Sequence, residues 1–103
     1  MDNLDLNAGI KYDKDKPDWS LVNFKSLEGF VKVLGFGAKK YSRDNWKKVA
    51  DGEHRYFAAL LRHLSAWQNG EKKDPESGLS HLYHAMCNLY FLIFFDSVKE
   101  NKK

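Results

Sequence analysis

The sequence has few of the residues that mark several protein classes. Its 103 residues include one cysteine, two prolines and a net charge of only +3. The single Cys87 excludes an intrachain disulfide and a zinc site built on paired cysteines, and it fits a reducing compartment. The longest apolar run, residues 89–95, is far shorter than the ~20 residues that span a bilayer, and residues 1–5 lack the basic and apolar parts of a signal peptide. We therefore expect a cytoplasmic protein that does not enter the membrane.

The length and composition are typical of one small globular domain. With 43% hydrophobic and 30% charged residues, the chain can bury a single core, which argues against disorder over most of its length. Residues 1–22 are too polar to start that core and contain Pro17, so we expect an arm there. Residues 96–103 are predicted to form a frayed tail. The sequence thus predicts one domain over 1–103 with an arm and a tail.

Three segments have apolar residues at helical spacing. The first covers about 24–38 and ends near Gly35 and Gly37, and the second runs from about 51 or 53 to 68, before Asn69 and Gly70. The third begins near 77 or 80 and continues to about 99. The sequence therefore predicts an all-α chain of three helices with an extended N-terminal arm.

The third helix is apolar on nearly every side between Ala85 and Phe95. A chain of three helices offers too few neighbours to cover such a helix completely. We therefore expect at least a homodimer with this helix in the interface, and hence a homo-oligomeric helical bundle.

Aromatic residues are abundant, at 15% of the chain, and several lie in basic loops rather than on the helices. A ring beside a cation suits a ligand with a flat base and a phosphate, because the ring stacks on the base and the cation meets the phosphate oxygens. The alternative is that the rings fix the loops to the helices and the lysines face solvent. A long nucleic acid fits poorly, because the acidic residues interrupt any basic stripe. The loop residues that we predict to bind a nucleotide are Lys11, Tyr12, Lys16, Trp19, Lys40, Tyr41, Asn45 and Trp46.

The second helix carries a further candidate anion site. Arg55 and Arg62 are seven residues apart and so share one face, and His63 lies on the adjacent row. Both arginines can then contact one phosphate group. The alternative is a solvent-facing charged surface, or ion pairs with acidic residues of the following loop.

The third helix has a polar stripe within its apolar surroundings. His81, His84 and Asn88 are spaced i, i+3, i+7 and so lie on one face. Burying three polar groups together is costly unless they find partners. They are predicted to contact a ligand, to form a metal site with His63 and a loop carboxylate, or to form a buried hydrogen-bond network. Cys87 is adjacent and is expected to be a packing residue.

Three stretches resemble a phage family, the N-terminal domain of dATP/dGTP diphosphohydrolases. They lie within residues 9–17, 36–46 and 62–88, and the third is long and specific, with Arg62-His63-Leu64 and Gly70-Glu71 followed by Glu76-Ser77-Gly78 and His81. The resemblance covers residues 9 to about 95. It implies a phage protein that acts in the host cytoplasm on a purine nucleotide.

Two activities are compatible with such a ligand. In its small size and general character the chain also resembles the sponge proteins that phages use to sequester cyclic-nucleotide immune signals of CBASS-type or Thoeris-type defences. Because the acidic residues do not form the E-E-x-x-E helix of MazG-type pyrophosphatases, we take sequestration of a purine signal such as a cyclic dinucleotide, without a cofactor, as the first hypothesis. The alternative is a Mg²⁺-dependent dATP/dGTP diphosphohydrolase, with Glu71, Asp74 and Glu76 as metal ligands and His63 or His84 as the proton-transfer group. A third hypothesis is a non-catalytic helical protein that docks a partner.

Overall fold

The described part of the chain, residues 8–101 of a computed structural model, is helical. It contains three α-helices, α2 (Glu28–Lys40), α3 (Gly52–Gln68) and α4 (His81–Asn101), and three short 3₁₀ turns at Trp19–Leu21, Phe24–Leu27 and Asn45–Lys48. Within these residues the only β-type pairing is a single bridge between Lys73 and Ser80. The predicted all-α class with three helices is confirmed, but the first helix begins at Glu28 rather than near residue 24, because Phe24–Leu27 form a 3₁₀ turn.

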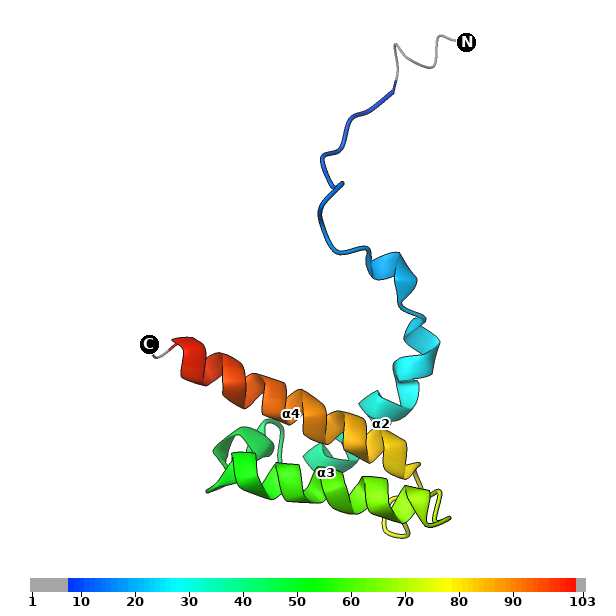
Figure 1. The fold of residues 1–103 in the computed structure, drawn as a ribbon, viewed down its shortest axis with the longest axis vertical. Helices are drawn as coiled ribbons and strands as arrows, with labels where there is room; N and C mark the ends of the chain where they lie inside the picture. The colour runs from blue at the N-terminus through cyan, green and yellow to red at the C-terminus, as the bar shows by residue number, and fades with distance from the viewer. Residues whose placement is uncertain (1–7, 102–103) are drawn as a thin grey trace.

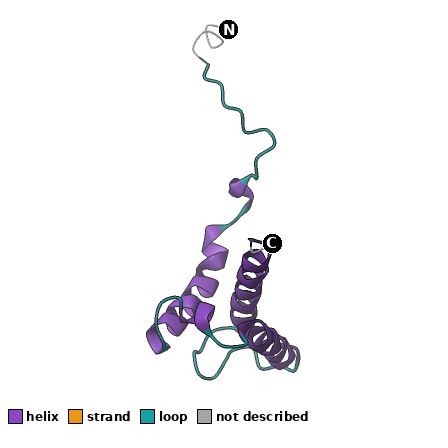
Figure 2. Ribbon diagram, turned by 90° about the vertical axis from the view of Figure 1, so that its left-hand side faces the viewer, coloured by secondary structure: helices purple, strands orange, loops and turns teal. Residues whose placement is uncertain are grey.

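Helices α3 and α4 form a hairpin, and α2 packs across the first half of α4 (Figures 1 and 2). Asp51 precedes α3 in the left-handed conformation, with φ 55°, and the hairpin loop 69–80 contains Gly70 at φ 102° and Gly78 at φ 73°. Gly70 and Gly78 adopt their positive φ angles without the steric cost that a side chain imposes. The loop therefore turns sharply enough to return over the start of α4.

The core is small and is completed by rings. Val33, Leu60, Ala85 and Cys87 are the buried apolar residues of the described chain. Beside them Trp46 stacks on Phe91, with ring centroids 4.3 Å apart and planes at 20°, and packs edge-to-face with Phe94, with ring centroids 5.0 Å apart. Aromatic pairs at such distances stabilise a fold beyond the area that they bury. The structure thus shows a packing role for Trp46; its predicted stacking on a base stays a prediction.

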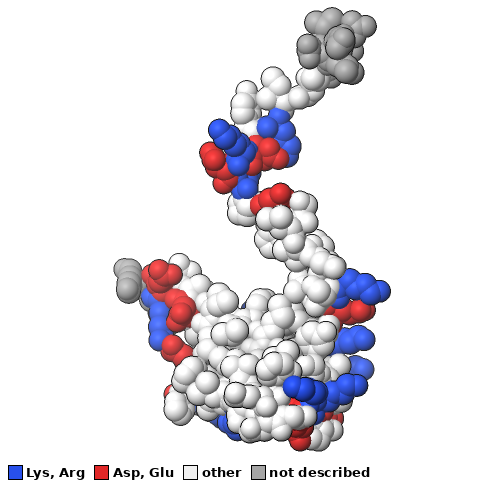
Figure 3. Space-filling view, turned by 45° about the vertical axis from the view of Figure 1, so that its right-hand side comes forward, with Lys and Arg blue, Asp and Glu red and all other residues white. Residues whose placement is uncertain are grey.

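The arm lies away from the helices from residue 8 to the 3₁₀ turn at Trp19–Leu21 (Figure 1). Tyr12 is 85% exposed and Trp19 is 69% exposed. Figure 3 shows the lysines of this arm interspersed with acidic residues. Residues 1–7, the first part of the predicted arm, lie outside the described residues.

Helix α4 ends slightly beyond the predicted end near residue 99 and so includes most of the predicted tail. The predicted frayed tail begins at residue 96, whereas the helix runs to Asn101, and Lys99 on its last turns forms an ion pair with Glu53 of α3. The charged composition of residues 96–103 does not by itself predict a contact with a neighbouring helix. Residues 102–103 lie outside the described residues.

The single chain leaves apolar side chains of both long helices exposed. Leu61 on α3 is 49% exposed, and Leu89 and Ile93 on α4 are 49% and 66% exposed. Assembly into a homo-oligomer through α4 stays a prediction. None of the helices in the described part of the chain is long and apolar enough to cross a membrane.

Cys87 is expected to resist thiol reagents in the folded protein. It is 2% exposed, and burial raises the pKa of its thiol to about 12. Because the thiolate is the nucleophile, both effects slow alkylation. Iodoacetamide, followed by mass spectrometry, should modify Cys87 rapidly in urea and at least about 100-fold more slowly in buffer, since a pKa shift of this size suppresses the thiolate more than that. Equal rates in the two conditions would show that α4 is not packed as described.

Candidate functional site

The loop 69–80 is held against the start of α4 by backbone hydrogen bonds. The His81 N–H donates to the carbonyl of Lys72 at 2.9 Å, and the Asp74 N–H donates to the carbonyl of Leu79 at 2.8 Å. The Asp74 carboxylate in turn accepts the Ser77 N–H at 2.9 Å. This last contact fixes the Asp74 side chain, which is 18% exposed, toward the helices.

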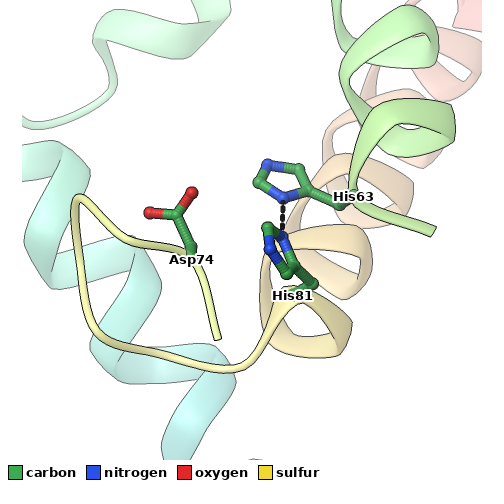
Figure 4. Close-up of side chains that lie close together, drawn as sticks. All are labelled: His63, Asp74 and His81. Carbon is green, nitrogen blue, oxygen red and sulfur yellow. Dashed lines mark hydrogen bonds between the residues drawn. The ribbon is translucent and has the colours of Figure 1, made fainter. Parts of the chain in front are cut away.

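Two histidines from different helices meet beside this loop. Nδ1 of His63 on α3 lies 2.8 Å from Nδ1 of His81 on α4 (Figure 4). Nε2 of His81 lies 2.8 Å from Oε1 of Glu71. A carboxylate only accepts, so Nε2 of His81 carries the hydrogen of that contact. In neutral His81 the lone pair is then on Nδ1, and His63 donates its Nδ1–H to it.

His84 lies one turn further along α4 and joins the same group. Its ring stacks on that of His63, with centroids 4.6 Å apart and planes at 12°. Its Nε2 lies 2.7 Å from Oγ of Ser77 and 3.7 Å from Oδ2 of Asp74. We call His63, His81, His84, Glu71 and Asp74 the histidine–carboxylate cluster.

The surroundings of His63 and His84 favour neutral imidazoles beside an ionised Asp74. Burial lowers the pKa of His63 to about 4, with the other two histidines adding to the effect, and burial also lowers the pKa of His84. Burial acts to raise the pKa of Asp74, but hydrogen bonds from Ser77 outweigh it and lower that pKa overall. Near neutral pH His63 and His84 therefore offer imidazole lone pairs beside the carboxylate of Asp74.

The structure brings together some of the predicted site residues. His63, His81, His84 and Asp74 form one group, and Glu71 reaches it through His81. The remaining predicted metal ligand, Glu76, pairs instead with Lys40 at 2.6 Å. Among the described residues one set of potential ligands, His63, Asp74 and His81, has donor atoms within 4.8 Å of one another.

The remaining predicted residues are not members of this cluster. Asn88 is buried, and its amide donates to the carbonyl of His84 within α4. Arg55 and Arg62 are exposed on α3, and the guanidinium of Arg55 donates to the carbonyl of Ala50 at 3.3 Å. The arm residues Lys11, Tyr12, Lys16 and Trp19 are exposed.

A second feature is an aromatic groove of about 880 Å³ between α2, α3, α4 and the loop that joins α2 to α3. Three predicted nucleotide-binding residues, Tyr41, Asn45 and Trp46, line it. Sequence reasoning missed four of its polar or aromatic residues: Arg43, Lys47, Tyr56 and Tyr90. Arg43 and Lys47 lie close to Tyr41 and Trp46 in the sequence, so the alternation of cations and rings could have indicated them as well. Tyr90 lies within an apolar run, which gives no such signal.

Comparison with known proteins identifies the family. The model of the family described as dATP/dGTP diphosphohydrolase, N-terminal, matches residues 6–103. This chain belongs to that family. A dATP/dGTP diphosphohydrolase of Salmonella phage PMBT28 is 34% identical over 87 residues, which are 84% of this chain and 29% of the phage protein. The chain therefore spans less than a third of that relative's length, and no solved structure matches it.

The comparisons favour one hypothesis drawn from the sequence over another. The chain is a phage protein similar to a dATP/dGTP diphosphohydrolase, and this similarity supports the second hypothesis better than the first. The first hypothesis, a sponge for a cyclic-nucleotide immune signal, receives no support from these comparisons. Catalysis, the ligand and the metal stay predictions.

Proposed function

We propose that this chain binds a purine deoxynucleoside triphosphate in the aromatic groove and takes part in its hydrolysis to the monophosphate and pyrophosphate. The observation that carries the proposal is the connection between the groove and the histidine–carboxylate cluster. Lys40, which ends α2, lies next to Tyr41 of the groove and pairs with Glu76 of the loop that holds Asp74. The family membership supports the same substrate class.

The groove has the chemistry that a purine base requires. Tyr41 is 64% exposed and lines the groove together with Trp46 and Tyr90. Nζ of Lys47 lies 5.5 Å from the centroid of the Trp46 ring, and Arg43 is in the same loop. A base stacked on a ring beside such cations combines apolar contact with attraction to its phosphates. We place the base here.

Lys40 would then guide the phosphates toward the cluster. Its Nζ lies 5.3 Å from the centroid of the Tyr41 ring and 2.6 Å from Oε2 of Glu76. This pair is exposed, so exchanging the Glu76 carboxylate for a phosphate costs little. A nucleotide whose base stacks on Tyr41 and whose phosphates contact Lys40 would extend toward Asp74 and His84.

The cluster supplies groups for the chemical step. In this hydrolysis a water molecule attacks the α-phosphorus, and the bond between that phosphorus and the oxygen bridging the α- and β-phosphates breaks. A base takes the proton of the water. Neutral His84, held by Ser77 beside ionised Asp74, is the group that we assign to this proton transfer. Mg²⁺ on the phosphates would neutralise the charge of the leaving pyrophosphate.

Product analysis and ring substitution test the proposal together. After incubation with dATP or dGTP and Mg²⁺, denaturation should release monophosphate and pyrophosphate, and Tyr41→Ala should weaken nucleotide binding about tenfold, because stacking of a base on a ring is worth about 1–3 kcal/mol. Phe24→Ala is the matched control, because Phe24 is 63% exposed and lies outside the groove. Recovery of intact nucleotide would reject hydrolysis by this chain, and equal affinities of the two variants would reject the groove as the binding site.

A further inference from the structure

We propose that His63, Asp74 and His81 bind a divalent transition-metal ion, with Zn²⁺ the best match. The three residues come from α3, the loop 69–80 and α4, and the side chain of Asp74 faces the two imidazole rings (Figure 4). One donor atom of each lies within 4.8 Å of the donors of the other two. The inference concerns metal binding by the chain alone and does not depend on the proposed nucleotide activity.

The contact between the two histidines marks the place of the ion. Their Nδ1 atoms lie 2.8 Å apart with one hydrogen between them. Two nitrogen ligands of tetrahedral Zn²⁺, each at about 2.0–2.1 Å from the metal, are about 3.3 Å apart. A separation of the rings by about half an ångström, with the His63 hydrogen moved to Nε2, therefore exchanges the shared proton for the cation.

The surrounding groups already orient the ligands as they do in metal proteins. Glu71 accepts the Nε2–H of His81, which leaves the Nδ1 lone pair directed at the site. Carboxylate–histidine–metal arrangements of this kind fix the ring and raise its basicity. The Ser77 N–H holds the Asp74 carboxylate, and the His84 ring stacks on His63. Each of the three ligands thus has its own positioning contact.

The ligand set selects the class of ion. Two imidazoles and one carboxylate suit Zn²⁺ and its transition-metal neighbours, whereas Mg²⁺ prefers oxygen ligands and water. Three protein ligands leave a fourth position for water or another oxygen donor. Asp74 is 18% exposed, and Glu71 is 54% exposed, so the site lies close enough to solvent for an ion to enter.

Titration of the metal-free full chain with Zn²⁺, followed by calorimetry, tests this assignment without nucleotide. We expect one ion per chain, no displacement by excess Mg²⁺, and visible bands of a four-coordinate ion when Co²⁺ replaces Zn²⁺. His63→Ala and Asp74→Asn should each weaken Zn²⁺ binding by more than 100-fold. Glu71→Gln should weaken it about 10–100-fold, as expected for a residue that orients a ligand.

His54→Ala is the matched control, because His54 is an exposed histidine of α3 that is not part of the cluster. It should bind Zn²⁺ as tightly as the unaltered chain. Circular dichroism shows whether each variant keeps its helices, and Asp74→Asn preserves shape if His63→Ala does not fold. Absence of Zn²⁺ binding, unchanged affinity in folded Asp74→Asn, or an equal loss in His54→Ala would overturn the metal site. If the unaltered chain binds Zn²⁺ but does not bind dATP or dGTP, only the proposed function is rejected.

Discussion

Replacing Gly29 with alanine is expected to destabilise the protein by about 3 kcal/mol, the upper part of the usual range for an overpacked core. Gly29 is buried on α2, and a Cβ atom there would lie 2.1 Å from Cε2 of Tyr83 on α4. That separation is far inside van der Waals contact with a rigid ring. The helices must move apart or Tyr83 must leave its place, and either change weakens the α2–α4 contact.

Gly35→Ala provides the control on the same helix. A Cβ atom at Gly35 would meet nothing within 4 Å, so the substitution removes only backbone freedom. Alanine is favoured over glycine in a helix interior by about 1 kcal/mol, and we expect Gly35→Ala to stabilise the chain by up to that amount. Urea unfolding of the two variants should therefore move in opposite directions. A common direction would show that α2 does not approach α4 through Gly29.

The helices were predictable because their signals are local. Apolar spacing and the stops at Asn69 and Gly70 place α3 within a residue or two of its observed bounds, and α4 is equally clear. The end of α4 was predicted less well, since the Lys99–Glu53 contact depends on how two helices pack. The spacing of residues along one helix does not show which residues of another helix they contact.

The same reasoning explains which parts of the site were foreseen. The i, i+3 spacing of His81 and His84 places them on one face of α4, and a contribution of His63 with a loop carboxylate was among the predicted alternatives. Which carboxylate joins was open, because it depends on the turn at Gly78 and on the hydrogen bonds that direct Asp74 inward while Glu76 turns to Lys40. The alternation of cations and rings in residues 40–46 pointed to the groove, but not to its far wall on α3 and α4.

Asp74→Asn is expected to separate the chemical step from nucleotide binding. The amide oxygen of asparagine can still accept the Ser77 N–H, so the loop should keep its conformation. The negative charge beside His84 is lost, and with it the field that stabilises the imidazolium formed when His84 takes a proton from water. General-base contributions amount to about 10²–10⁴-fold, and we expect turnover of dATP and dGTP to fall by at least about 100-fold.

Nucleotide affinity should change by less than about threefold in the same variant, because the base and Lys40 lie outside the altered contact. Steady-state kinetics and equilibrium binding measured on one preparation distinguish the two effects, with Asp96→Asn, an exposed aspartate of α4, as the control of equal charge change. Tyr41→Ala should show the opposite pattern, with weakened binding and a turnover number that falls less. If Asp74→Asn and Tyr41→Ala instead impaired binding equally and left turnover intact, base and phosphates would share one site, and the division between the aromatic groove and the histidine–carboxylate cluster would be wrong.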